Sequence, residues 1–313
     1  MDAESPDCDG FSNTNSANSS VAKGSSDITL RTIGGVGGIQ NSNNFHVTAY
    51  RPYSPPFPDP FANVNPDPSA MKCAQAPVTT TTTVVDSPAW TETVPKAHGS
   101  GTTTIDHPAV THDVTTTTYT GGAQALTDGM DVTTMKDSSG AQANCFTSIS
   151  VGSNRSLSLP SGTYYVNAGD LNVQGSLSCT ACTIVLTNKT SASPIGNVKV
   201  NASSNINMTA PDTGTYKGIA IYQDRRATDC NSCNKVNGNS GSIIQGALYF
   251  PSQELEYNGT GTTSAICTMF VAKRLNFSGN STTSNKFKGM DDPACAAFGL
   301  GGFPTIWMVR LVG

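Results

Sequence analysis

Two Cys-x-x-Cys pairs are the residues of this sequence whose types and spacing could do chemistry most directly. Cys179 and Cys182 form one pair, and Cys230 and Cys233 form the other. Four thiolates from two such pairs can hold zinc in a tetrahedral site, and a single pair can act as a redox-active dithiol. The same cysteines can also close a disulfide within each pair, or cross-link one pair to the other.

The composition of the chain favours disulfides over zinc. Only 13% of the residues are charged, and polarity comes from Ser, Thr and Asn, as is common in extracellular β proteins. The chain has nine cysteines, and the 47 residues between the two pairs exceed the usual gap in a compact zinc ribbon. We therefore expect disulfides formed in an oxidising compartment, with no metal ion and no cofactor.

The other five cysteines are scattered along the chain. Cys267 with Cys295, and Cys73 with Cys145, are the most economical further bridges, although sequence alone does not fix the connectivity. The odd count leaves one cysteine over, and Cys8 near the terminus is the candidate for the unpaired one.

One polar cluster could support catalysis. A carbohydrate-active β-helix enzyme needs converging carboxylates, or carboxylates with a calcium ion and a basic residue. The best local cluster of this kind is Asp224, Arg225 and Arg226 with Asp229. Asp224 follows the apolar segment Ile219–Tyr222, so we interpret the cluster as the end of a strand with ion pairs. We expect no catalytic residue here.

Three histidines lie in a threonine-rich region. His98, His107 and His112 occur there beside Asp106 and Asp113, which are residue types that bind metals. The region has few large apolar residues to fix these side chains in place, so we expect no preformed metal site.

The elements that must position these residues are short strands. From Gly162 to Gly279, apolar or alternating runs of three to five residues are each closed by Asn, Gly or Ser. Asparagines recur at intervals of 34, 36, 21 and 22 residues, at Asn167, Asn201, Asn237, Asn258 and Asn280. This spacing predicts an all-β fold, a parallel β-helix or solenoid whose corner asparagines stack. A β-sandwich is the alternative.

Composition divides the chain into four parts. Strands at Ser25–Leu30 and Phe45–Tyr50 are predicted in the first part, and seven prolines mark the second as an extended connector. Threonine runs at Thr79–Thr83 and Thr115–Thr118 indicate a flexible or edge-strand insertion, and Ile306–Val312 is predicted to cap the last part. The four parts are N-terminal β coils (1–50), the Pro-rich connector (51–72), the Thr-rich insertion (73–145) and the β-solenoid domain (146–313).

The charge and the hydropathy pattern exclude some functions. The formal net charge is −4 and no basic cluster exceeds Arg225-Arg226, which argues against nucleic-acid binding. No apolar run approaches the length of a membrane span, and the start MDAESPDCDG lacks the features of a signal peptide. We expect the chain to be a portion of a longer exported protein.

Several strings in the second half of the chain resemble the C-terminal region of TadG-like proteins, which are associated with Tad/Flp pilus assembly in bacteria. They occur in order over about residues 160–313, and a PDPFA string at 58–62 precedes them. The strings are GTYYVN at 162–167, APDTGTYKGI at 210–219, YQDR at 222–225, GALYFPSQELEYNG at 246–259 and MVRLVG at 308–313.

The resemblance implies a cell-surface protein without catalysis, acting in pilus assembly or adhesion. Its partners would be pilus or envelope proteins, with a surface carbohydrate as a further possibility. A carbohydrate-active β-helix enzyme and a purely structural surface spacer are the two other hypotheses.

Overall fold

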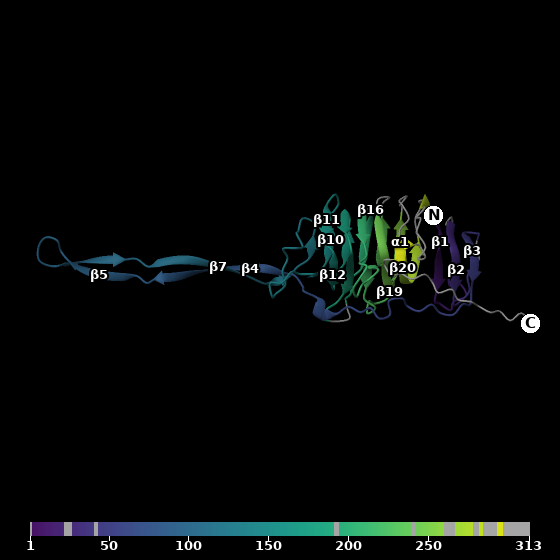
Figure 1. Ribbon diagram of the computed structural model, residues 1–313, viewed down its shortest axis with the longest axis horizontal. Helices are drawn as coiled ribbons and strands as arrows, with labels where there is room; N and C mark the ends of the chain where they lie inside the picture. Colours follow the sequence, from purple (N-terminus) through teal and green to yellow (C-terminus); the bar gives the residue numbers. More distant parts are fainter. Residues whose placement is uncertain are drawn as a thin grey trace, which may run out of the picture.

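The structure is a computed structural model built almost entirely of β-strands, and it describes residues 2–21, 27–40, 43–190, 194–238, 242–259, 267–277, 282–283 and 293–296. Its two helical segments within these ranges, η1 (Pro68–Ala70) and α1 (Pro293–Ala296), are far too short to cross a membrane. The strands form a body, a smaller sheet at one end of the body, and an arm that projects from the other end (Figure 1).

Thirteen strands form the body, and every pairing between them is parallel. This confirms the all-β prediction, and a β-sandwich would instead have antiparallel sheets. The strands are β8 (Leu126–Thr127), β9 (Cys145–Phe146), β10 (Ile149–Val151), β11 (Ser156–Leu159), β12 (Gly162–Asn167), β13 (Leu171–Val173), β14 (Ser176–Cys179), β15 (Cys182–Thr187), β16 (Val198–Thr209), β17 (Ile219–Gln223), β18 (Asn234–Gly238), β19 (Ile243–Gly259) and β20 (Thr268–Phe277).

One column of side chains shows how successive strands stack. Each member pairs in register with the next, in the order Val151, Val173, Val200, Val236, Tyr257 and Phe277. The four valines are at most 1% exposed. Burying one such side chain contributes about 1.5–3 kcal/mol, so each layer stabilises the layers on both sides of it.

The spacing of the asparagines in the sequence matches the spacing of the stacked layers only in part. Asn237 pairs with Asn258, and the Asn258 Nδ2 donates a hydrogen bond to the Asn237 Oδ1 at 2.7 Å, as expected for stacked asparagines. The interval from Asn167 to Asn201 is not a layer step, because Asn167 pairs with Thr187 in β15 whereas Asn201 belongs to β16. Asparagine occurs at several different corners of the chain path, which makes its spacing an incomplete guide. Asn280 lies outside the described residues.

The N-terminal strands lie at the far end of the body, not beside its first strands. β1 (Asp2–Ser12), β2 (Asp27–Gly35) and β3 (Phe45–Arg51) form a parallel sheet with β21 (Thr282–Thr283) in the order β21-β1-β2-β3. β2 and β3 confirm the two strands predicted in this part of the sequence. Figure 1 shows these strands next to β20. The capping strand predicted at 306–312 lies outside the described residues.

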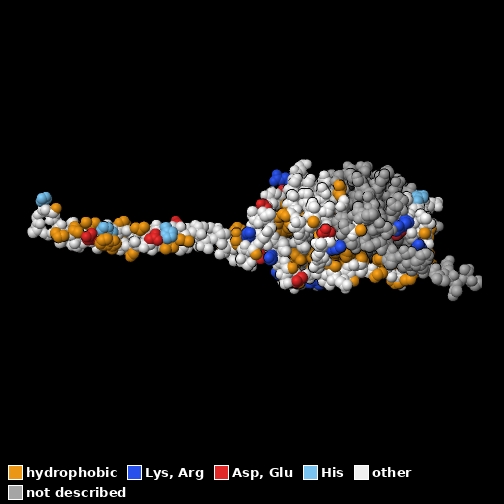
Figure 2. Space-filling view, in the orientation of Figure 1, with side chains coloured by type: hydrophobic (Ala, Val, Ile, Leu, Met, Phe, Trp, Pro, Cys, Tyr) orange, Lys and Arg blue, Asp and Glu red, His pale blue; other side chains and the backbone are white. Residues whose placement is uncertain are grey.

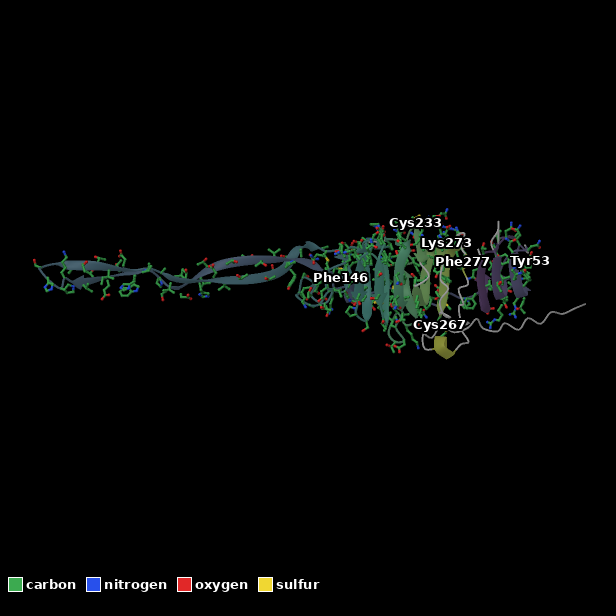
Figure 3. The ribbon with its side chains drawn as sticks, turned by 90° about the horizontal axis from the view of Figure 1, so that it is seen from above. Tyr53, Phe146, Cys233, Cys267, Lys273 and Phe277 are labelled. Atoms are coloured by element: carbon green, nitrogen blue, oxygen red, sulfur yellow. A yellow bond between two sulfur atoms is a disulfide. The ribbon has the colours of Figure 1, made fainter. Side chains whose placement is uncertain are left out.

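Residues 52–72, which we call the strap, run back along the body from this end to the arm. Tyr53 lies at the end of the molecule that holds β1–β3, and Phe146 at the end that carries the arm (Figure 3). The strap residues Phe61 and Met71 are buried against aromatic and aliphatic side chains of the body that include Tyr222 and Tyr249. The proline-rich connector therefore packs on the body instead of crossing solvent.

Arg225 holds the strap through its main-chain oxygens. Its guanidinium donates hydrogen bonds to the carbonyl oxygens of Val64, at 2.6 Å, and of Phe61, and forms an ion pair with Asp59 at 3.1 Å. Burial raises the pKa of Tyr222 to about 12, and its hydroxyl donates a hydrogen bond to the Val64 oxygen at 2.7 Å. Main-chain oxygens of an extended segment need hydrogen-bond donors. These side chains supply them, in addition to the Val64 N–H, which donates to the Phe61 oxygen at 2.9 Å.

Residues 75–123, which we call the arm, form two antiparallel ribbons that project from the body (Figures 1 and 2). The inner ribbon pairs β4 (Gln75–Ser87) with β7 (Val110–Ala123), and the outer ribbon pairs β5 (Trp90–Pro95) with β6 (Thr102–His107). The Thr-rich region expected to be a flexible or edge-strand insertion is thus a regular ribbon. Its boundary with the body is earlier than expected, since β8 already pairs with β10.

We expect Arg225→Ala to loosen the strap. The substitution removes charge-assisted hydrogen bonds to two carbonyl groups, and the free energy of unfolding should fall by about 2 kcal/mol. Limited proteolysis should then cut within residues 52–72 much faster than in the wild type. Arg155→Ala is the control, because the Arg155 side chain is 63% exposed beside Asp128 and its loss should change little. Equal effects of both substitutions would contradict the role of Arg225.

Candidate functional site

Eight cysteines are joined in four disulfides. They are Cys73–Cys145, Cys179–Cys182, Cys230–Cys233 and Cys267–Cys295. The sulfurs of both Cys-x-x-Cys pairs are thus bonded within their own pair, and among the described residues no group of His, Cys, Asp and Glu side chains is arranged to hold a metal ion. The side chain of Cys8 lies outside the described part of the structure. Four disulfides indicate a secreted or extracellular protein.

Asp224 is a buried structural carboxylate. It is 3% exposed and accepts hydrogen bonds from the Thr187 hydroxyl at 2.7 Å and from Arg226, which also forms an ion pair with it at 2.7 Å. Burial raises the pKa of Asp224, but the hydrogen bonds from Arg226 and Thr187 outweigh this effect, and the net pKa is lowered. The carboxylate is fixed in its charged form at the end of β17.

The rest of the predicted polar cluster is not assembled into one site. Arg225 turns toward the strap, and Asp229 pairs instead with Lys273 and Arg274 of β20. Hydrogen bonds from Arg274 and Lys273 lower the pKa of Asp229 to about 2. The two carboxylates therefore have separate cationic partners, and the arrangement does not offer the acid and base pair that glycoside hydrolysis requires.

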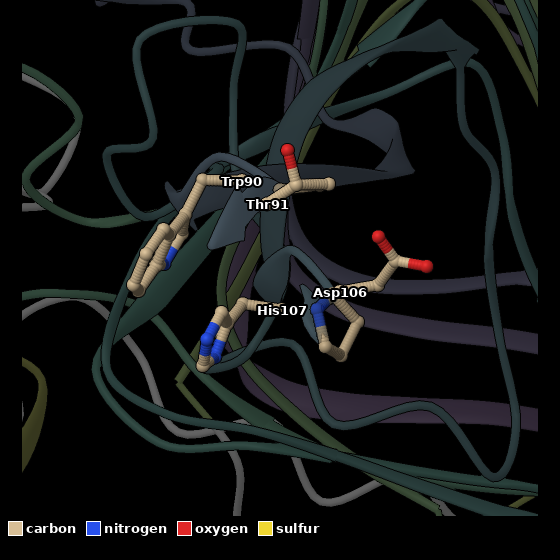
Figure 4. A pocket seen from close by; sticks show the side chains of 6 residues that line it. Trp90, Thr91, Asp106 and His107 are labelled. Atoms are coloured by element: carbon tan, nitrogen blue, oxygen red, sulfur yellow. The ribbon is translucent and has the colours of Figure 1, made fainter. Parts of the chain in front are cut away.

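The outer ribbon of the arm carries an aromatic pair. Trp90 and His107 are directly opposite each other in β5 and β6, and their rings stack at a centroid distance of 4.0 Å with an interplanar angle of 8°. Trp90 is 54% exposed. The rings lie together in Figure 4, while Thr91 and Asp106 point away from them. These residues, with Ala89 and Pro108, line a pocket where the outer ribbon begins.

The two faces of the outer ribbon differ in chemistry, because side chains alternate along a strand. Cross-strand pairs place Trp90, His107, Glu92 and Ile105 on one face. The Glu92 carboxylate lies 3.5 Å from the His107 Nε2. Thr91 and Asp106 start the opposite face, which continues with Thr93, Thr104 and Thr102. One face can thus pack an apolar or aromatic group, and the other can form hydrogen bonds.

The histidines of the arm are separated from one another. His107 stacks on Trp90, whereas His112 lies on the inner ribbon with its Nδ1 2.8 Å from the Asp86 carboxylate. Asp113 instead accepts a hydrogen bond from Thr83, and Asp106 points away from the His107 ring. The residues that could have bound a metal ion are thus distributed over different faces and ribbons.

Trp90 is the functional candidate that the sequence reasoning missed. It is one of two tryptophans in the chain and stands in a region with few other large side chains. A lone aromatic residue in a Thr-rich tract was the available signal, but its partner His107 becomes visible only from the hairpin register.

Comparison of the chain with known protein families, with curated proteins and with solved structures gave no match. The proposed function therefore rests on the geometry of the body and of the arm.

Asp224→Asn should destabilise the fold. Loss of the charge that binds Arg226 is expected to lower the free energy of unfolding at neutral pH by about 2 kcal/mol. In the wild type, the lowered pKa means that this contribution is present above the ordinary aspartate value of 3.8 and is lost as the pH falls through the folded-state value. Denaturant unfolding of the variant should accordingly depend less on pH in the acidic range.

Asp229→Asn is the matched control for this experiment. Its carboxylate also pairs with two cations, but it is 47% exposed, where solvent screens ion pairs, so its substitution should change stability much less. A stable Asp224→Asn protein that loses turnover on a polysaccharide would contradict the structural role and favour the enzyme hypothesis.

Proposed function

We propose that this chain is a binding protein of the bacterial cell surface, in which the body holds the arm away from itself and the arm contacts a partner. The observation that carries the proposal is the exposed Trp90, stacked on His107 where the outer ribbon of the arm begins. Tryptophan is enriched in binding hot spots, and the His107 ring holds this exposed side chain in place. Figure 2 shows other hydrophobic side chains gathered along the same outer part of the arm.

The fold of the body that best accounts for its pairings is a β-solenoid. Three series of parallel strands support this: β10-β13-β16, β11-β14-β16 and β9-β12-β15-β17. Each passage of the chain adds one strand to each series before it returns to the first. A stack of this kind forms a rigid base from which an arm can project.

The finer proposal, that the partner belongs to a Tad/Flp-type pilus or to the envelope, rests on the resemblance. Three of its strings meet at one contact. Asp59 and Phe61 of PDPFA touch Arg225 of YQDR and Tyr249 of GALYF: Arg225 pairs with Asp59, and Phe61 packs on the Tyr249 ring at 5.4 Å. The strings therefore describe one structural unit, which supports treating them together as a single resemblance.

Trp90→Ala should weaken binding to the partner by at least tenfold, since loss of a hot-spot tryptophan costs about 2 kcal/mol or more. The measurement is binding of the purified oxidised chain to isolated pili and to envelope proteins. Met130→Ala is the control, because Met130 is an exposed apolar residue of the body, at 42% exposure. Equal binding by all three proteins would overturn the proposal. Binding that is competed only by free glycans would show a carbohydrate partner instead.

A further inference from the structure

The inner ribbon of the arm has an unusual edge. β4 and β7 form a sheet of two strands, so each has one side whose backbone groups no other described strand covers. From Val78 to Val85 the β4 edge reads VTTTTTVV, with no charge, no proline and no glycine. Natural proteins usually protect such edges with lysine, proline or a bulge, because they pair readily with another strand.

A ribbon of two strands also lacks the means to be stable by itself. Val78, Val84 and Val114 lie on one face of the ribbon and are each 40% exposed. Isolated two-stranded hairpins are marginal in water, and three or more strands with an apolar face are needed for independent stability. The inner ribbon would therefore gain stability by pairing with further strands, and its open β4 edge is available for that pairing.

The β4 edge is complementary to itself. The segment is nearly palindromic about Thr81: if a second β4 runs antiparallel with Thr81 opposite Thr81, then Val78 faces Val84 and Thr79 faces Thr83. The partners in each pair are equally far from Thr81, three residues for Val78 and Val84 and two for Thr79 and Thr83. Directly opposite residues of an antiparallel pair lie on the same face of the sheet, so each pair is in contact across the seam. A two-fold axis through Thr81 produces this arrangement, and two-fold dimers are the commonest assemblies.

The side-chain pattern of the ribbon continues across such a seam. Within one chain, the Thr79 and Thr117 hydroxyls lie 3.4 Å apart, those of Thr81 and Thr115 lie 3.3 Å apart, and Thr83 donates to Asp113 at 2.7 Å. Pairing of two β4 edges would place a row of Thr115, Thr81 and the two equivalent residues of the second copy across four strands. The opposite face would carry Val78, Val84 and Val114 among threonines.

We propose that Val78–Val84 is a pairing edge for a second copy of this chain, which joins two inner ribbons into a four-stranded antiparallel sheet. The occupant is a second copy because the edge is self-complementary in sequence and carries no charge that would select another partner. The seam ends before Trp90 and His107, so this inference does not depend on the binding role of the outer ribbon.

Thr81→Lys tests the seam in the full-length oxidised chain. It places two ammonium groups opposite each other at the two-fold axis, and like charges directly opposite are destabilising. Thr115→Lys is the matched control, since Thr115 is the cross-strand partner of Thr81 on the same face but belongs to β7. Analytical ultracentrifugation should show a wild-type dimer, a dimer dissociation constant raised at least tenfold by Thr81→Lys, and little change with Thr115→Lys. Circular dichroism checks that all three proteins fold.

A thiol cross-linking experiment tests the register independently. With Cys8→Ser as background, Thr81→Cys should give an intermolecular cross-link with a short bifunctional reagent, and Thr115→Cys should give far less. The proposal is overturned if the wild type is monomeric at all concentrations studied, or if Thr115→Lys dissociates the dimer as strongly as Thr81→Lys. A dimer that cross-links at another site also overturns it.

Discussion

Parallel pairing between successive layers is the interaction on which the body depends. Because each strand bonds to the strands one layer before and after it, a side chain at a given position packs on the same position of its neighbours. The column from Val151 to Phe277 has steps of 22, 27, 36, 21 and 20 residues. Layers with different numbers of residues thus share the same buried column, and the additional residues of the longer layers lie outside it.

Three amide side chains buried within the stack bond to one another, although the Gln223 Oε1 has no hydrogen-bond partner among the described residues. Gln223, Asn234 and Gln253 are buried and bonded to one another: the Gln223 Nε2 and the Asn234 Nδ2 both donate to the Gln253 Oε1, at 2.9 and 2.8 Å. The Gln253 Nε2 donates in turn to the Thr228 oxygen at 2.7 Å. A buried amide group without such bonds would cost about 1–3 kcal/mol, so these hydrogen bonds stabilise the packing of β17, β18 and β19 on one another.

Local patterns made much of this structure predictable. Residue types within a few tens of positions predict the short strands and the stacking of Asn237 on Asn258. They also predict the disulfides within the two Cys-x-x-Cys pairs. Other features depend on long-range pairing that no local pattern encodes. Asp2 pairs with Thr282, which moves the N-terminal strands to the far end of the body and forces the strap to run back along it. The pairing of Trp90 with His107 likewise depends on hairpin register, and Thr-rich composition alone does not reveal that register.

The arm presents the opposite physical situation from the body, because it has almost no interior. Its strands depend on main-chain pairing, on the preference of threonine for extended backbone, and on side-chain bonds between the two strands. The Cys73–Cys145 disulfide closes a loop with a sequence separation of 72 residues at its base. This disulfide limits the conformations of the unfolded arm, so less conformational entropy is lost when the arm folds. Because it fixes only the base, the register of β4 and β7 further out must be maintained by their own contacts. Long runs of one residue type specify register weakly. The observed pairing is distinguished from a shifted one by features that break the repetition: Pro77, the Thr83–Asp113 hydrogen bond and the Asp86–His112 pair.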